Sequence, residues 1–249
     1  MKDLFSKQAI TYAQFRPNYP SELFDFVLQN TGNKQVAWDC ATGNGQAAKV
    51  LAPHFEKVYA TDMSQKQLDN AVKADNIFYS VGKAEKTDFT EGVFDLITVA
   101  QAIHWFDFEQ FYTEVQRVAK PNATLAIWGY GTLCFQDEQV DELVQNFYWN
   151  IVGTYWDAER RHIDALYETI PFPFESIETP KFSMNFNWNR NELEGYLNSW
   201  SSVQNFIKAN DYNPIPNLML DLQDIWDEFE QKALSFPIFM KIGKVVRIN

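Results

Sequence analysis

The residues best suited to chemistry lie in one short segment, Asp39-Cys40-Ala41-Thr42-Gly43-Asn44-Gly45. Glycines let the backbone approach a bound molecule closely, so this segment is typical of a loop that cradles a nucleotide-like ligand. A second carboxylate, Asp62, follows 17 positions after Gly45, where it can accept hydrogen bonds from both hydroxyls of a ribose. Together the loop and Asp62 predict a site for a cofactor that contains a nucleoside.

Two classes of cofactor fit this segment. Gly43, Gly45 and Ala48 match the spacing Gly-x-Gly-x-x-Ala of dinucleotide-binding loops. In those loops a strand runs almost directly into the first glycine, whereas here Asp39 ends the strand four residues earlier. A carboxylate beside the cofactor opposes a pyrophosphate but suits the positive ammonium and sulfonium groups of S-adenosylmethionine. The segment therefore favours a methyl donor and leaves open a dinucleotide or a glycine turn without a ligand.

Alternating apolar runs and turn residues predict the elements that position this loop. From about residue 35 to 131, short β-branched runs alternate with helical patterns, which is typical of a doubly wound parallel sheet. In such sheets ligands bind at the carboxyl ends of the strands. The predicted strands are Val36–Cys40, Val58–Thr61, Ile77–Val81, Phe94–Ala100 and Thr124–Trp128, and the predicted helices are Ser21–Gln29, Gln46–Ala52, Ser64–Lys73 and Phe108–Ala119.

The pattern becomes mostly helical after Phe135. Of the 40 aromatic residues, 27 lie after residue 100, which suggests a substrate-covering region in this part, although plain core is the commoner reason for such a concentration. The sequence predicts helices at 137–151, 157–170, 191–197 and 220–232 and strands at 177–187 and 237–248. We therefore expect an N-terminal cap segment (1–34), a cofactor-binding core (35–135), a mostly helical insertion (136–236) and a final strand of the core sheet (237–249).

The composition excludes several classes of protein. A formal net charge of −12 repels phosphate backbones and anionic lipids, so we expect neither a nucleic-acid nor a membrane partner. Cys40 and Cys134 are far apart and the three histidines are scattered, so we expect no disulfide framework and no metal site. The N-terminus lacks the apolar stretch of a secretory signal, and we expect a cytoplasmic protein.

The motifs resemble those of class I S-adenosylmethionine-dependent methyltransferases, specifically the small-molecule branch related to trans-aconitate and cantharidin methyltransferases. The resemblance covers nearly the whole chain. Residues 12–20 look like the branch's Tyr-x-x-x-Arg-Pro-x-Tyr-Pro motif, and residues 39–45 look like its first cofactor motif, with Ala41 where a glycine is usual. Residues 82–85 resemble the loop that lies along the adenine, and residues 100–107 resemble the loop after the fourth strand.

This resemblance implies a fold, a reaction and a set of cofactor-binding residues. The implied fold is a Rossmann-like, seven-stranded, mostly parallel sheet with an antiparallel last strand and a helical insertion. The implied enzyme transfers a methyl group from S-adenosylmethionine to a small molecule by in-line displacement, with O-methylation favoured, and releases S-adenosylhomocysteine (EC 2.1.1.-). The cofactor-binding residues would be Asp39, Ala41, Thr42, Gly43, Gly45, Asp62, Met63, Ala84, Glu85, Ala100 and Gln101.

His104 is the candidate catalytic residue. It follows the fourth strand, and an imidazole can take a proton from a hydroxyl or thiol near neutral pH. Alternatively, His104 and Trp105 only pack against or shape the cofactor pocket, since a carboxylate acceptor needs no base. We expect Tyr12, Arg16 and Tyr19 to close over the site, although Arg16 could instead form a surface ion pair.

Two other functions remain open at this point. One is an NAD(P)-dependent oxidoreductase, and the other is a cofactor-binding module without catalytic activity. Methylation of nucleic-acid bases is disfavoured, because the Asn/Asp-Pro-Pro-Tyr/Phe motif of such enzymes is replaced here by Ala-Gln-Ala-Ile-His-Trp at residues 100–105. The sequence names neither the acceptor nor the oligomeric state.

Overall fold

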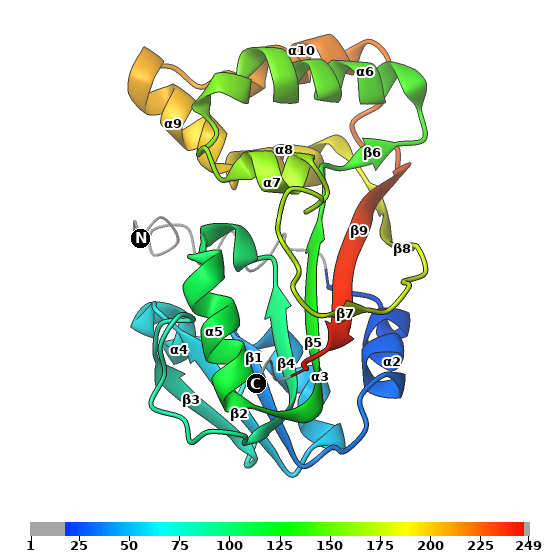
Figure 1. Ribbon diagram of the computed structural model, residues 1–249. Helices are drawn as coiled ribbons and strands as arrows, with labels where there is room; N and C mark the ends of the chain where they lie inside the picture. The colour runs from blue at the N-terminus through cyan, green and yellow to red at the C-terminus, as the bar shows by residue number, and fades with distance from the viewer. Residues whose placement is uncertain (1–17, 247–249) are drawn as a thin grey trace.

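The computed structural model describes residues 18–246 and has two layers, an α/β layer around a twisted sheet and a helical lobe above it (Figure 1). The sheet has the order β3-β2-β1-β4-β5-β9-β6, and β7 and β8 pair with the other edge of β9. Strands β1 to β5 are parallel, and β9 is antiparallel to β5. The strands are β1 Val36–Cys40, β2 Lys57–Asp62, β3 Ile77–Val81, β4 Phe94–Ala100, β5 Ala119–Tyr130, β6 Cys134–Phe135, β7 Glu175–Ser176, β8 Phe182–Trp188 and β9 Lys232–Lys244.

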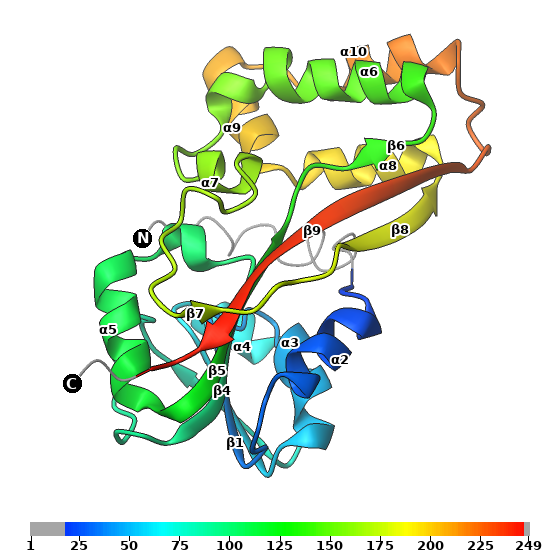
Figure 2. The same cartoon turned by 45° about the vertical axis from the view of Figure 1, so that its right-hand side comes forward.

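Helices cover both faces of the sheet (Figure 2). On one face, the apolar sides of α2 and α3 bury Ala37 and Val58 of the neighbouring strands. On the other face, Phe111, Val115 and Val118 recur at helical spacing and turn the apolar side of α5 inward. The helices of this layer are α2 Ser21–Gln29, α3 Gln46–Leu51, α4 Gln65–Asp69 and α5 Phe108–Val118, with 3₁₀ turns at Ala52–His54 and Ile103–Trp105.

The lobe above the sheet is built from five helices and shares its core with the layer below. Tyr148 and Trp226 of the lobe belong to the same buried cluster as Leu23 of α2, so apolar contacts continue from the sheet into the lobe. The long strand β9 also runs from the lobe down into the sheet (Figure 2). The lobe consists of α6 Glu138–Asn146, a π-helical turn Phe147–Ile151, a 3₁₀ turn Gly153–Tyr155, α7 Arg160–Asp164, α8 Arg190–Asn198, α9 Ser201–Asn210 and α10 Ile215–Gln223.

The fold class predicted from the sequence is confirmed. Five parallel strands alternate with helices, and the last strand enters the sheet antiparallel. The described residues form seven strands of five or more residues, as expected, and two additional strands of two residues each, β6 and β7. These two short strands pair with opposite edges of β9, so they extend the sheet at its border without changing its order.

Two predicted helices are shorter in the structure because the chain turns early. The helix expected to reach Lys73 ends at Asp69, and the Val72 N–H then donates to the Asn44 carbonyl at 3.3 Å, beside the glycine loop. The helix expected at 157–170 is limited to Arg160–Asp164. It cannot continue because Leu166 and Tyr167 adopt left-handed backbone conformations, with φ of 50° and 60°.

The C-terminal part differs most from expectation. Helix α9 was not predicted, since its Ser- and Asn-rich sequence disfavours a helix, and burial of Val203 and Phe206 overrides that tendency. Helix α10 begins at Ile215 and ends at Gln223, earlier than the expected 220–232. Strand β9 begins five residues before Pro237. The strand tolerates this proline, whose carbonyl still accepts from the Gly131 N–H at 2.9 Å.

Candidate functional site

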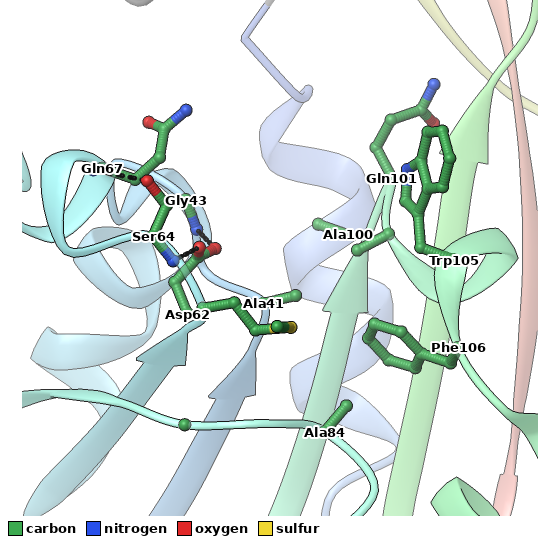
Figure 3. Close-up of a pocket in the computed structure, with 13 residues that line it drawn as sticks. Ala41, Gly43, Asp62, Ser64, Gln67, Ala84, Ala100, Gln101, Trp105 and Phe106 are labelled. Carbon is green, nitrogen blue, oxygen red and sulfur yellow. Dashed lines mark hydrogen bonds between the residues drawn. The ribbon is translucent and has the colours of Figure 1, made fainter. Parts of the chain in front are cut away.

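A pocket opens at the carboxyl ends of β1, β2 and β4, where doubly wound sheets bind ligands (Figure 3). Eight residues of the predicted site line it, namely Ala41, Gly43, Asp62, Met63, Ala84, Ala100, Gln101 and Trp105. Five lining residues were not assigned to the site from the sequence, namely Ser64, Gln67, Gly82, Ala102 and Phe106. All thirteen lie at the carboxyl ends of the strands or in the loops and first helical turns that come after them, so the parallel sheet brings them together.

The glycine loop between β1 and α3 is a tight turn with three left-handed residues. Ala41, Gly43 and Gly45 have φ of 55°, 58° and 83°. The Gly45 N–H donates to the Thr42 carbonyl at 3.0 Å, and the Thr42 N–H donates to the Thr61 carbonyl at 2.9 Å, which ties the loop to β2. A Cβ atom at Gly43 would have no heavy atom within 4 Å, so the pocket wall here leaves open space for a ligand.

Asp39 anchors this loop from beneath. It is 1% exposed and does not line the pocket. Its carboxylate accepts hydrogen bonds from Thr98 Oγ1 at 2.9 Å, from the Ala48 N–H at 3.0 Å and from Thr42 Oγ1. Ala48 lies in the first turn of α3, where a negative charge is favourable. Asp39 thus fixes both the loop and the start of α3, one layer behind the pocket wall.

The stability of the fold should depend on the charge of Asp39. Burial raises the pKa of this carboxyl from 3.8 to about 6, despite the hydrogen bonds that oppose the rise. A folded-state pKa above the unfolded value favours the fold at low pH, and this contribution is lost as the pH rises through 6. We therefore expect the unfolding free energy of the native protein to decrease by about 3 kcal/mol when the pH is raised from about 4 to 7. The unfolding free energy of Asp39→Asn, which lacks this titrating group, should not show this decrease. Urea denaturation of both proteins measures this difference, and a pH-independent difference would refute it.

Asp62 connects β2 to the glycine loop. Its Oδ2 accepts from the Gly43 N–H at 2.9 Å, and its Oδ1 accepts from the Ser64 N–H at 2.8 Å (Figure 3). Because each carboxylate oxygen can accept about two hydrogen bonds, each keeps one acceptor position. The carboxylate is therefore held rigidly at the pocket wall and retains capacity for two donors of a ligand.

Ala41 occupies a backbone conformation that suits glycine better. A left-handed conformation costs a residue with a side chain about 1–2 kcal/mol, whereas glycine's extra freedom in the unfolded chain costs somewhat less. Ala41→Gly should therefore stabilise the protein by about 0.5–1 kcal/mol in urea denaturation. Ala47→Gly, inside α3, should destabilise it by about 1 kcal/mol. If Ala41→Gly destabilised the protein as much as Ala47→Gly, residue 41 would not have a left-handed conformation.

The opposite wall of the pocket is apolar. Ala84 and Phe106 are both buried, and they face the loop across the open space (Figure 3). Glu85 does not line the pocket. Instead, its Oε1 accepts from the Asp107 N–H at 3.2 Å and joins the loop after β3 to the loop after β4. This wall therefore offers a flat apolar surface held by a polar link outside the pocket.

Gln101 presents its backbone to the pocket because its side chain is occupied. Its Oε1 accepts from the Tyr130 N–H at 2.8 Å, and its Nε2 donates to the Tyr130 carbonyl at 3.2 Å. Its own N–H donates to the Trp128 carbonyl at 2.8 Å. Gln101 is also left-handed, with φ of 53°. These bonds lock the turn after β4 onto the end of β5.

His104 lies next to the pocket but does not line it. The side chain is 6% exposed, and its Nδ1 is 2.9 Å from the hydroxyl of Tyr167 in the lobe. Trp105 does line the pocket. Tyr19 packs edge-to-face on Trp128, with ring centroids 5.7 Å apart. The other two residues expected to cover the site, Tyr12 and Arg16, lie outside the described residues.

The lining residues missed from the sequence had weak but readable signals. Ser64 starts α4, and the Gln67 N–H donates to its hydroxyl at 3.4 Å, as the Ser-x-x-Gln pattern after Asp62 suggests. Ala102 and Phe106 belong to the loop after β4, whose position predicts contact with a ligand. Gly82 follows β3 in the same way. Position after a strand was therefore a better guide than residue type.

Within residues 18–246, no three His, Cys, Asp or Glu side chains are grouped in a way that would hold a metal ion. Over the same residues, no helix is both long and apolar enough to cross a membrane.

Known proteins resemble this chain in sequence and in fold. A candidate methyltransferase of Dictyostelium discoideum is 34% identical over 249 aligned residues, which cover 97% of this chain and 95% of that protein. This chain belongs to the methyltransferase family. The methyltransferase domain family matches residues 38–127, which contain the glycine loop, Asp62 and the loop after β4.

Two further methyltransferases match most of the length of this chain. The solved structure of a candidate type II methyltransferase from Anaeromyxobacter dehalogenans has a TM-score of 0.86 and 32% identity, and the match covers 94% of this chain and all of that one. The protein CRG1 of Saccharomyces cerevisiae, named as an S-adenosylmethionine-dependent methyltransferase, is 24% identical over 86% of this chain and 84% of its own length. The similarity therefore includes the lobe as well as the sheet.

Proposed function

We propose that this methyltransferase transfers a methyl group from S-adenosylmethionine to an oxygen atom of a small molecule, and that it belongs to the branch related to trans-aconitate and cantharidin methyltransferases. The observation that carries the proposal is the position of Asp62, a carboxylate with spare acceptor capacity bonded to the glycine loop at the pocket wall. This arrangement suits a ribose diol next to a close backbone approach.

The residues of the pocket fit S-adenosylmethionine in three ways. Asp62 has one acceptor position left on each oxygen for the two ribose hydroxyls. The open space at Gly43 admits a ligand close to the backbone. Ala84 and Phe106 offer an apolar wall for a flat base. In addition, Asp39 places a carboxylate behind the loop, which favours a cofactor with positive charge over a pyrophosphate.

The chain contributes mainly positioning and exclusion of water. S-adenosylmethionine supplies an electrophilic methyl group when bound. The loops after β1 and β4 hold the two sides of the pocket rigidly, through Asp39 and through the Gln101–Tyr130 bonds. Such rigidity keeps reacting groups aligned, which is a large contribution to the rate of an in-line displacement. The apolar wall at Phe106 limits the access of water to the reacting centre.

A small-molecule acceptor agrees with the charge and the lobe of this chain. The net charge of −12 disfavours polyanionic acceptors such as nucleic acid. We propose that residues 136–236 cover the acceptor, because this segment is rich in aromatic side chains and sits above the carboxyl ends of the strands (Figure 1). Tyr148, Trp156 and Trp200 form one aromatic group in this segment.

A transfer assay tests the proposed function. Purified protein is incubated with methyl-labelled S-adenosylmethionine and a panel of small carboxylic acids, phenols, alcohols, amines and thiols. We expect label to appear on an oxygen atom of at least one acid, phenol or alcohol, and not on DNA or RNA. Binding of the cofactor without transfer to any acceptor would favour a binding module, and transfer only to amines or thiols would overturn the O-methylation.

A further inference from the structure

The contact between His104 and Tyr167 joins two parts of the chain that are 63 residues apart. His104 follows β4 beside the pocket, whereas Tyr167 comes from the lobe. Their side chains are 6% and 1% exposed, and His104 Nδ1 lies 2.9 Å from the Tyr167 hydroxyl. Tyr167 is among the largest fully buried side chains of the described residues.

The backbone around Tyr167 is held in an unfavourable conformation. Leu166 and Tyr167 are both left-handed, with φ of 50° and 60°, and bulky residues rarely adopt this conformation. The Tyr167 N–H donates to the His162 carbonyl at 2.7 Å, and the Tyr167 ring packs edge-to-face on Phe239 at 4.6 Å. Strain of this kind persists where the surrounding structure enforces it and is concentrated at functional positions.

The surroundings determine which atom of the pair donates. Burial raises the pKa of Tyr167 well above its ordinary value, so the phenol keeps its proton. A buried hydroxyl normally donates to an acceptor, and among the hydrogen bonds of the described residues the only one to this hydroxyl joins it to His104 Nδ1. The other titratable groups near the phenol are Tyr19, Tyr130 and Arg160, from the segment before α2, from β5 and from α7.

A bond donated by the phenol fixes the tautomer of the imidazole. In a neutral imidazole, one ring nitrogen accepts a hydrogen bond and the other carries the proton. If Nδ1 accepts from Tyr167, the proton is on Nε2. His104 can then donate a hydrogen bond through Nε2 to a group that meets this atom. Because Nε2 already carries the proton, it has no lone pair with which His104 could accept another one.

We propose that Tyr167 is a positioning residue that holds neutral His104 with its proton on Nε2, so that His104 serves the methyl acceptor as a hydrogen-bond donor and not as a general base. The role of His104 toward an acceptor rests on the proposed function, whereas the tautomer does not. In this scheme the acceptor oxygen supplies the electron pair for its new bond to the methyl carbon, and the pair of the broken carbon–sulfur bond stays on sulfur. His104 removes no proton, so the acceptor class is one whose attacking oxygen carries no proton when it arrives, such as a carboxylate.

Nitrogen-15 NMR of the histidine side chains tests the tautomer without any activity measurement. The His104 signals are assigned by their loss in His104→Gln, since the chain has only two other histidines, His54 and His162. We expect an unprotonated Nδ1 and a protonated Nε2 in the native protein, and loss of this preference in Tyr167→Phe, which keeps the ring on Phe239. A protonated Nδ1 in the native protein, or an unchanged spectrum in Tyr167→Phe, would overturn the proposal.

Tyr112→Phe is the matched control. Tyr112 is also a buried tyrosine, and its hydroxyl donates to the Pro171 carbonyl of the lobe at 2.6 Å. Its removal should leave the His104 signals unchanged. A loss of the tautomer preference in this variant as well would show that general loosening, and not the Tyr167 hydroxyl, controls His104, and would overturn the proposal.

Activity separates a donor from a base. Gln retains an N–H donor but cannot act as a base near neutral pH, whereas Phe has neither property. We expect His104→Gln to keep methyl transfer within about tenfold of the native rate and His104→Phe to lose about 100-fold or more, because the acceptor is then no longer held in line with the methyl group. Equal losses in both variants, or no loss in either, would contradict the donor role. If the native protein transfers no methyl group, the proposed function fails, but the NMR result still decides the tautomer.

Discussion

Asp62→Ala is expected to weaken binding of S-adenosylmethionine by roughly 1–3 kcal/mol, the range for losing hydrogen bonds to a charged group. The carboxylate would accept from the ribose hydroxyls, and it also holds the Gly43 and Ser64 amides in place. The variant therefore loses direct contacts to the ligand and part of the order of the loop. Isothermal titration calorimetry of the native and variant proteins measures the difference in affinity.

Asp69→Ala is the control for Asp62→Ala. Asp69 lies at the end of α4, is exposed, and is bonded to the Gln65 side chain at 2.8 Å, away from the pocket lining. Its removal makes the same change in net charge without changing the pocket. We expect its affinity for the cofactor to match that of the native protein. Equal affinities of all three proteins would show that Asp62 does not hold the ribose.

Gly45→Ala should have the largest effect on folding of any substitution in the loop. Gly45 has φ of 83°, and a Cβ there would lie 2.2 Å from the hydroxyl oxygen and 3.1 Å from the Cζ of Tyr79. The strained backbone and the overlap together should reduce the unfolding free energy by about 2–4 kcal/mol. Urea denaturation of the apo protein measures this loss.

Two further variants separate the causes of that loss. Gly43→Ala, two residues earlier, adds the same methyl group at φ of 58° but meets no atom within 4 Å, so it should cost only about 1 kcal/mol of stability while obstructing the ligand. In a Tyr79→Phe background, Gly45→Ala should cost about 1 kcal/mol less, because the overlapping hydroxyl is gone. If Gly45→Ala reduced the unfolding free energy by the same amount in that background, the strained backbone and not the overlap with the hydroxyl would cause the loss.

The core of the fold could be predicted from the sequence because local patterns and tertiary contacts agree there. The first, third and fourth strands have the predicted bounds, and helix α2 matches its prediction in full. In this half, apolar β-branched runs, capping residues and the glycine turn all specify the same structure. The lobe is different, since α9 forms from a Ser- and Asn-rich sequence only because Val203 and Phe206 are buried by distant segments.

The sequence predicts where the pocket lies better than it predicts what each residue around the pocket does. The position of Asp62 follows from strand order, and the structure places it in the pocket. The sequence predicts that Asp39 lies beside the cofactor, but in the structure it lies behind the loop. There its carboxylate accepts hydrogen bonds from Thr42, Ala48 and Thr98. A sequence cannot show which neighbours a buried carboxylate will find. The same holds for Tyr167, which reaches His104 through a left-handed turn that no local pattern indicates.

The pocket between the glycine loop and Phe106 should bind S-adenosylmethionine and not a dinucleotide. Both ligands fit the glycine spacing of the loop, but only the methyl donor suits the carboxylate behind it. Calorimetric titration of the native protein with S-adenosylhomocysteine and, separately, with NAD(H) compares them directly. We expect saturable binding of one S-adenosylhomocysteine per chain and no binding of NAD(H). Tight binding of NAD(H) with no response to S-adenosylhomocysteine would contradict it.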